Sequence, residues 1–547
     1  MLVPAAAALA LGLWGIDRHH SMWRDESVTY EVAHRSLGAL WRLLGHVDAV
    51  HGLYYLLMHA VFACWDGGPV ALRLPSVLAT ALAAAGTGAI GARLAGCRAG
   101  VLAGLVLALL PVTQQYAQEG RSYALVTAAV TWASHLFLRG LGSARRGWWA
   151  GYAAVLALAG WLHEFAVLAL PAHALTLRWL RVPRRVWRHW GAAAAAVLVV
   201  PAPAAVVSAG QVDRQLGWLG RPGPPAWLQY AAVVAVGVLS ARLSPRRAGD
   251  DGGARAVLVR LALPLLVVPA GLLMTVSLLR PCYVDRYVLY GTVGLALPAG
   301  AALDRAAGRW RRLAPLPRAL TAAAAAVAAV AVLLPWSLLV RSPESRKDDV
   351  LAVSRAVASV ARPGDGVLFL PARRREWLLS SPAVYARLHD LALAGSPVAS
   401  GTLQGTELPA PAVRRRIRAT PRVVALSDPP DQPLDPYAGE VAKREELRGH
   451  FVVCERIPVR GARVTVYAWP GRCGTAGHRS AVRTRAPSPG SGGRGCGCAW
   501  GGGCRRTGPV PAVPDRLCRI STSRWPARRT RPSRGCRSGS SCSPDPT

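Results

Sequence analysis

The sequence predicts an all-α polytopic membrane protein of about eleven transmembrane helices, followed by a small extracytoplasmic α/β domain and a disordered tail. Three observations predict it. Between Met1 and Val340 the chain is a succession of apolar runs, most of them close to the roughly 20 residues that cross a bilayer as a helix. Short breaks that carry arginine separate the runs. After Val340 the pattern changes to mixed helix and strand, and after residue 470 to Gly, Ser, Arg, Pro and Cys.

The apolar runs define the expected spans. They lie at 2–16, 69–92, 100–113, 122–139, 148–160, 163–178, 191–209, 226–243, 256–279, 287–303 and 319–340. The runs 100–113 and 148–160 are short for a span, so the total carries a margin of about two. The first run has no basic residue before it and no convincing cleavage site after it. We therefore expect an uncleaved anchor rather than a signal peptide.

The loops between the runs fall into two classes. One class is rich in arginine, as at 178–188 and 305–318, and the other holds few basic residues. Cytoplasmic loops concentrate Lys and Arg, so we expect the Arg-rich loops and the N-terminus inside. The segment from Arg341 onward is then outside. This pattern predicts a multi-pass protein of the plasma (cytoplasmic) membrane with an extracytoplasmic C-terminal domain.

The formal net charge of +36 does not indicate a nucleic-acid partner. Lys347 and Lys443 are the only lysines, against a large excess of Arg, Ala, Gly and Pro. That bias is typical of a GC-rich coding sequence, and most arginines outside the tail occupy loops between apolar runs. We expect no nucleic acid among the partners.

Neither the cysteines nor a glycine motif indicates a site. Cys64, Cys97, Cys282 and Cys454 occur singly in the body of the chain, and the other cysteines lie in the tail. We infer neither a disulfide scaffold nor a zinc site. The segment Gly86–Gly91 matches a dinucleotide-binding fingerprint, but it lies inside a span with no strand before it. A small-residue face for helix packing is the better interpretation.

The first outer loop, 17–68, holds the strongest candidate for a catalytic acid. Asp25 and Glu26 follow the first span closely, where a carboxylate can act as a general base toward an acceptor hydroxyl. The alternative is a helix N-terminal turn whose acidic residues favour the dipole. Later in the loop, His51 opens an apolar stretch too short to cross the membrane. We expect a helix there that lies along the outer interface.

Two further outer loops carry charges suited to a phosphate. Glu119 and Arg121 lie at the mouth of one span, and Arg286, with Arg280 nearby, at the top of another. Interfacial ion pairing or snorkelling would explain the same residues. His163-Glu164, with Asp48 or His51, offers possible metal ligands, so a divalent metal stays open while no metal ligand is assigned.

The segment 341–470 is expected to form the outer domain. It contains a helical pattern at 348–361 and strand-like runs at Gly366–Leu370, Arg422–Ser427 and Val464–Trp469. The domains expected are thus 1–340, 341–470 and the disordered tail 471–547, which has no hydrophobic periodicity. Whether the tail is a genuine in-frame segment is open.

Several segments together resemble the family 39 glycosyltransferases, membrane enzymes of the GT-C class related to protein O-mannosyltransferases and lipid A aminoarabinose transferases. The segments that carry the resemblance are Asp25-Glu26, His51, Leu53–Leu57, Ala71–Ser76, Gln118–Leu125 and Asp285–Leu289. The resemblance covers residues 1–340 and, more loosely, the outer domain to about residue 470. Gly52 and Gly120 stand where many members have Pro and Ala.

The resemblance implies a GT-C-like fold and transfer of a hexose, with mannose favoured, from a polyprenyl-phosphate donor. It implies that Asp25 is the base and that Glu26 supports it in a single displacement. Arg121, Arg286 and Arg280 would bind the donor phosphate, and the substrate-binding residues would be His51, Tyr54, Glu119 and Tyr123. The partners implied are the lipid-linked donor, membrane lipid and an extracytoplasmic acceptor, which is a protein, a lipid or a glycan.

Other functions fit a polytopic membrane protein. A lipid or sugar transporter or flippase would place functional charges at mid-membrane and show weak internal repeats, neither of which is evident. A non-catalytic membrane scaffold would make Asp25, Glu119 and Arg286 individually dispensable. An arabinosyl or oligosaccharyl transferase of the same fold would differ in its donor.

Overall fold

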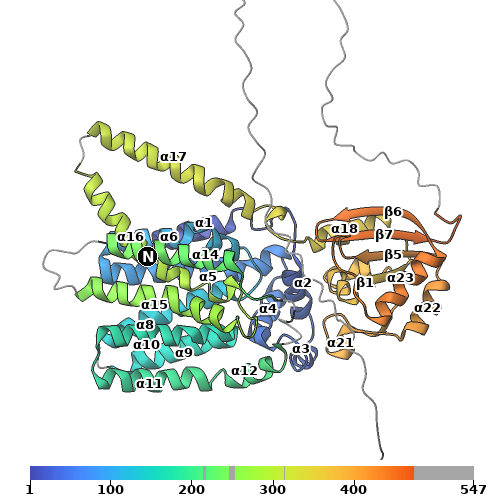
Figure 1. Ribbon diagram of the computed structural model, residues 1–547, viewed down its shortest axis with the longest axis horizontal. Coiled ribbons are helices and arrows are strands. Elements are labelled where there is room, and N and C mark those ends of the chain that lie inside the picture. Colours follow the sequence, from blue (N-terminus) through green and yellow to red (C-terminus); the bar gives the residue numbers. More distant parts are fainter. Residues whose placement is uncertain (144, 213–216, 218, 245–252, 313–314, 474–547) are drawn as a thin grey trace, which may run out of the picture. The chain divides into compact units, whose positions relative to one another are not determined.

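The computed structural model describes residues 1–143, 145–212, 217, 219–244, 253–312 and 315–473. All but the first three residues of the predicted disordered tail, 471–547, lie outside the described residues. Met1–Gly477 forms one compact unit that contains both the apolar helices and the α/β elements (Figure 1). The predicted domain boundaries at 340 and 470 therefore stay a prediction.

The apolar part of the chain is a bundle of helices (Figure 1). Its helices are α1 (Leu2–Leu13), α5 (Pro69–Ala95), α6 (Cys97–Leu109), α7 (Pro111–Ala117), α8 (Tyr123–Leu141), α9 (Arg146–Leu162), α10 (Ala169–Leu180), α11 (Arg184–Val199), α12 (Ala202–Ala209), α14 (Pro224–Leu243), α15 (Gly253–Val276), α16 (Gly291–Trp310) and α17 (Pro315–Val340).

Five of the described helices, α5, α8, α14, α15 and α17, are long and apolar enough to cross a membrane. The number rises to seven if α6 with α7, bent by 66°, and α11 with α12, bent by 46°, each form one span. The other expected spans fall on the described helices α1, α9, α10 and α16, which are shorter or less apolar. The multi-pass helical fold is confirmed, whereas the total of eleven spans stays a prediction.

The glycine-rich segment of α5 is a packing face, as predicted. A Cβ on Gly91 would lie 2.8 Å from the Cα of Gly100 in α6, and a Cβ on Gly100 would lie 2.4 Å from the carbonyl oxygen of Gly88. The two backbones approach so closely that only glycine fits at these points. The dinucleotide interpretation has no structural basis here, because the segment lies within a helix.

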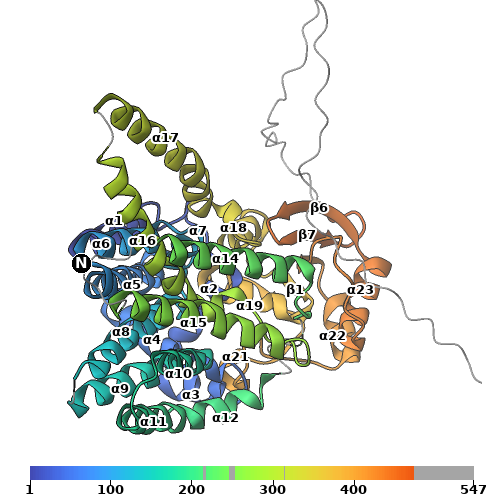
Figure 2. The ribbon, with the colours of Figure 1, turned by 60° about the vertical axis from the view of Figure 1, so that its left-hand side comes forward.

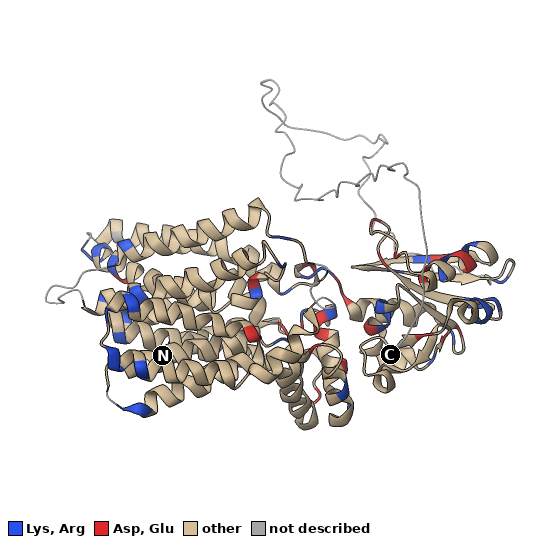
Figure 3. Cartoon of the chain, turned by 60° about the horizontal axis from the view of Figure 1, so that its bottom comes forward, with Lys and Arg blue, Asp and Glu red and all other residues tan. Residues whose placement is uncertain are grey.

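The segment between α1 and α5 folds into α2 (Arg24–Ala33), α3 (Leu37–Leu44), the 3-10 turn η1 (Ala49–His51) and α4 (Gly52–Cys64). The helix expected after His51 is therefore present. Other short turns are η2 (Glu164–Leu168), η3 (Asp285–Val288) and η4 (Pro343–Ser345). Lys and Arg gather at one end of the bundle, whereas its acidic residues lie mainly at the end that carries α2 (Figure 3).

The α/β part contains a five-stranded sheet. Its strands are β1 (Gly366–Leu370), β2 (His389–Asp390), β5 (Arg422–Ser427), β6 (Val452–Val459) and β7 (Ala462–Ala468), and β3 (Leu393–Gly395) pairs separately with β4 (Thr406–Glu407). The order is β2-β1-β5-β7-β6, with β2, β1 and β5 parallel and the last two antiparallel. Two of the predicted strands have the observed bounds, and the third is displaced by one or two residues.

Helices cover both faces of this sheet, because alternate strand residues point to opposite sides. The helices of the α/β part are α18 (Val350–Val360), α19 (Arg375–Leu379), α20 (Pro382–Tyr385), α21 (Pro397–Ser400), α22 (Ala410–Arg418) and α23 (Ala438–His450), with the turn η5 (Ala372–Arg374). Val367 and Phe369 of β1 join one buried cluster with α18 and α19. Leu368, between them, joins another with α22 and α23.

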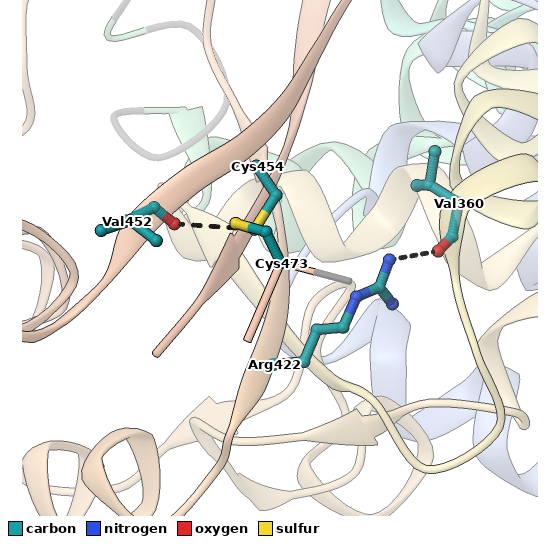
Figure 4. Close-up of a disulfide and its surroundings, with 5 residues drawn as sticks. All are labelled: Val360, Arg422, Val452, Cys454 and Cys473. Atoms are coloured by element: carbon teal, nitrogen blue, oxygen red, sulfur yellow. Dashed lines mark hydrogen bonds between the residues drawn. A yellow bond between two sulfur atoms is a disulfide. The ribbon is translucent and has the colours of Figure 1, made fainter. Parts of the chain in front are cut away.

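The structure contains a disulfide that the sequence analysis did not predict. Cys454 in β6 is bonded to Cys473, five residues after the end of β7 (Figure 4). Spacing along the chain does not show the pair, because it forms only when β6 and β7 lie antiparallel and the chain turns back beyond Trp469. On the same sheet, Arg422 donates a hydrogen bond of 2.7 Å to the carbonyl oxygen of Val360.

Candidate functional site

Asp25 and Arg286 form the centre of the candidate site. The Nη2 atom of Arg286 lies 3.4 Å from the Oδ2 atom of Asp25, although 261 residues separate them in the chain. Both side chains keep about one sixth of their surface exposed, at 17% for Asp25 and 16% for Arg286. A carboxylate that is held in place and still accessible is what a general base requires.

Aromatic rings surround the guanidinium of Arg286. Its Cζ atom lies 5.8 Å from the ring centroid of Trp23, 5.6 Å from that of Tyr123 and 5.7 Å from that of Tyr287. Its Nε also donates a hydrogen bond of 3.1 Å to the Tyr123 hydroxyl. The cation–π contacts and this hydrogen bond hold the guanidinium in place, so Tyr123 acts here through Arg286.

Glu26, the neighbour of Asp25, is fully buried and holds three segments together. It accepts hydrogen bonds from Arg73 at 2.7 and 2.8 Å and from the backbone N–H of Gly120 at 3.1 Å, and Arg18 lies 3.5 Å away. Burial alone would raise the pKa of Glu26, but Arg73 and Arg18 outweigh it and lower the pKa to about 2. The carboxylate therefore stays ionised, in a supporting position rather than at the accessible surface.

Glu119 is buried on the other side of this network. Its Oε2 lies 3.4 Å from Nη2 of Arg346, which also donates to the carbonyl of Gln115 at 2.9 Å. Burial raises the pKa of Glu119 to about 7, although Arg346 and Arg286 favour the charged form. Its Oε1 has no hydrogen-bond partner among the described residues.

Arg121 lies next to His51 and the start of α4. Its Nη1 donates to the Tyr55 hydroxyl at 3.3 Å, and that hydroxyl donates to Asp48 at 2.7 Å. Within the described part of the chain, its buried Nε has no hydrogen-bond partner. Burial, reinforced by Arg121, lowers the pKa of His51 well below its usual value, so the ring is neutral.

The start of the α/β part contacts the segment that carries Asp25. Asp348 accepts a hydrogen bond of 2.8 Å from the backbone N–H of Arg24, and Asp349 accepts one of 3.3 Å from Met22. Helix α19 also packs on α2 (Figure 2). Burial raises the pKa of Glu376, on α19, to about 8 against the opposing charge of Arg24. The position of Asp25 thus depends on residues more than 300 positions away.

The remaining predicted residues differ in their placement. Tyr54 is fully buried, with Arg121 among the charges near its hydroxyl. Arg280 is exposed just beyond α15. His163 approaches His51, with their ring centroids 6.0 Å apart. Among the described residues no group of three or more His, Cys, Asp and Glu side chains has the arrangement of a metal site, so no metal ligand is assigned.

Four residues that complete this site carried no assigned role in the sequence analysis: Arg73, Tyr55, Arg346 and Asp348. Arg73 had an available signal, because a charged residue within an apolar span is costly and is usually paired or functional. Arg346 and Asp348 had none, since nothing in the sequence indicates that the segment after α17 returns to the loop after α1.

Known proteins resemble this chain in part of its sequence and in its fold. Residues 51–207 match the family described as dolichyl-phosphate-mannose-protein mannosyltransferase. The crystal structure of ArnT from Cupriavidus metallidurans bound to undecaprenyl phosphate is similar at 15% identity, covering 85% of this chain and 97% of that one, with a TM-score of 0.55. Its apo structure is similar at 14% identity and a TM-score of 0.54, with the same coverage. The chain has the GT-C fold.

The GT-C resemblance predicted from the loop motifs is thereby confirmed. Within the matched segment lie His51, Tyr54, Glu119, Arg121 and Tyr123, whereas Asp25 and Arg286 lie outside it. At 15% identity, the likeness to ArnT concerns the fold alone. Among curated proteins, none matches the chain by sequence.

Proposed function

We propose that this protein is a membrane glycosyltransferase that moves a hexose, with mannose favoured, from a polyprenyl-phosphate donor to an extracytoplasmic acceptor. The observation that carries the proposal is the pairing of an accessible carboxylate, Asp25, with an aromatic-caged guanidinium, Arg286, at 3.4 Å. The match of residues 51–207 to a mannosyltransferase family supports the sugar. The similar ArnT, solved with undecaprenyl phosphate, supports a polyprenyl-phosphate carrier.

The reaction is a single displacement at the anomeric carbon. Asp25 takes the proton of the acceptor hydroxyl as its oxygen bonds to the anomeric carbon, on the face opposite the phosphate. The bond from that carbon to the phosphate oxygen breaks, and the polyprenyl phosphate leaves with the bonding electrons. Because the configuration inverts in one step, no covalent enzyme intermediate forms.

Two arginines provide the charge that the departing phosphate needs. Arg286 lies beside Asp25, and Arg121 has a buried N–H without a hydrogen-bond partner among the described residues. Preorganised cations that neutralise developing charge make a large contribution to such reactions. A phosphate bound by Arg286 also draws the guanidinium away from Asp25, which leaves the carboxylate available for the acceptor hydroxyl.

We place the site and the C-terminal part of the chain on the extracytoplasmic side. Basic residues gather at the opposite end of the bundle, as the positive-inside rule requires (Figure 3). The Cys454–Cys473 disulfide is consistent with this orientation, because disulfides persist in oxidising compartments.

Sugar transfer in membranes that express the protein tests the proposal. We expect transfer from radiolabelled polyprenyl-phosphate mannose by the wild type, and a loss of roughly 10²- to 10⁴-fold in Asp25→Asn at equal protein level. Asp66→Asn is the matched control, since Asp66 is an exposed acid, 44% accessible, between α4 and α5. Wild-type rates in Asp25→Asn would overturn the base assignment. Absence of transfer by the wild type would overturn mannose as the sugar and favour a transporter or scaffold if other lipid-linked sugars also fail.

A further inference from the structure

A cavity in the α/β part lies at the carboxyl ends of β1 and β5. Its volume is about 330 Å³, within the usual range of small-molecule sites. Leu370 and Pro371 line it where β1 ends, and Ser427 and Asp428 where β5 ends. Helix α23, strand β7 and the loop 429–435 contribute the other walls.

The cavity occupies the switch point of the parallel strands. From β1 the chain passes through α19 and α20 to β2, which pairs with one edge of β1. It later passes through α22 to β5, which pairs with the opposite edge of β1. The α19 and α20 residues Leu378 and Val384 pack on one face of the sheet, and Ile417 of α22 packs on the opposite face. In open α/β sheets, ligands bind outside the carboxyl ends of strands at such a reversal.

The charges of the cavity favour an anion. Its two lining carboxylates are already paired: Asp428 with Arg373 at 2.7 Å and with Arg374, and Asp435 with Arg373 at 3.6 Å. Three lining arginines, Arg444, Arg448 and Arg463, form no ion pair within the described part of the chain. Arg444 donates a hydrogen bond of 2.7 Å to the carbonyl of Asp435, which holds its guanidinium, and Arg463 donates a longer one of 3.4 Å to Ser427.

The other walls offer an apolar face and a hydroxyl. Tyr467, Leu447 and Leu434 line the cavity together with Pro429, Pro430 and Pro433. A ligand of one sugar ring with one anionic group matches both the size and this combination of aromatic, aliphatic and guanidinium surfaces. We propose that this cavity binds a monosaccharide unit bearing a carboxylate or a phosphate. The proposal stands apart from the transferase reaction and from the site at Asp25.

Calorimetric titration of the full-length protein in detergent tests the proposal with three probes: glucuronic acid, glucose 6-phosphate and glucose. We expect saturable binding of at least one anionic probe, at least about tenfold tighter than that of glucose, because charge-assisted hydrogen bonds to guanidinium distinguish them. The anionic probe that binds more tightly identifies the anionic group of the ligand as a carboxylate or a phosphate. No saturable binding of either, or equal binding of glucose, would overturn the proposal.

Variants assign the binding to this cavity. Arg448→Gln, an exposed position on α23, is expected to weaken the binding about tenfold, and Arg448→Gln with Arg463→Gln further. Arg415→Gln, an exposed arginine on α22 outside the cavity lining, is the matched control and should bind as the wild type does. Arg286→Gln should also leave the affinity unchanged. Loss of binding in Arg286→Gln, with normal binding in the α23 variant, would place the anion at the membrane site and refute the proposal.

Discussion

Replacing Glu26 by Gln is expected to destabilise the fold far more than an ordinary substitution does. Gln keeps the shape of the side chain but removes the charge that compensates Arg73 and Arg18, both of which are fully or almost fully buried. Breaking a buried ion pair by removing one partner typically costs about 3–5 kcal/mol.

The pKa of Glu26 gives a second, independent value for this loss of stability. A pKa lowered from 4.5 to about 2 on folding corresponds to roughly 3 kcal/mol of stabilisation of the ionised form, at about 1.4 kcal/mol per pKa unit. Because the folded pKa lies below the unfolded one, this stability is present above pH 4.5 and is lost as the pH falls toward 2. The difference in the free energy of unfolding between wild type and Glu26→Gln should therefore be largest at neutral pH and decrease in acid.

Thermal denaturation of detergent-solubilised protein, measured at several pH values, provides the assay. Glu445→Gln is the matched control, because it makes the same change in an exposed ion pair, in which the Glu445 side chain is 56% accessible. Solvent screens this pair with Arg414, so the substitution should leave the melting temperature nearly unchanged. Equal melting temperatures for Glu26→Gln and wild type at neutral pH, or an equal loss in Glu445→Gln, would refute the reasoning.

Three further predictions follow from single contacts. Because burial raises the pKa of Glu119 from 4.5 to about 7, stability should fall as the pH rises through that interval, and melting curves of Glu119→Gln should lack this dependence. Gly120→Ala should destabilise by about 1–3 kcal/mol in the same melting assay, since its Cβ would lie 2.4 Å from Cγ of the buried Leu72. Cys454 and Cys473 should resist alkylation until reduced, as mass spectrometry of the intact protein can show; alkylation without reductant would contradict the disulfide.

The Gly120 prediction also explains a departure from the family pattern. Alanine is common at this position in the resembling family, whereas here the side chain of Leu72 fills the space that a methyl group would need. The backbone N–H of Gly120 meanwhile donates to Glu26. A small residue is required here by local packing, and the loop stays in place through its hydrogen bond.

The sequence by itself determined the class of fold and much of the candidate site. Apolar runs near membrane length predict helices because backbone groups in lipid must pair within their own segment, and this local rule needs no tertiary information. The strands Gly366–Leu370 and Arg422–Ser427 were likewise evident as short apolar runs, which are typical of strands buried on both faces of a sheet. Asp25 and Arg286 were identified through the order of loop motifs, but their proximity was not.

Only the tertiary structure decided which charges meet. Glu26 is buried while Asp25 stays partly accessible, and this difference depends on Arg73, which reaches Glu26 from another helix. The disulfide depends on the antiparallel pairing of β6 and β7, and the arginine-lined cavity depends on a reversal of strand order. Such contacts join residues tens to hundreds of positions apart, and Coulomb and hydrogen-bond energies depend on distance in space, which local sequence patterns do not encode.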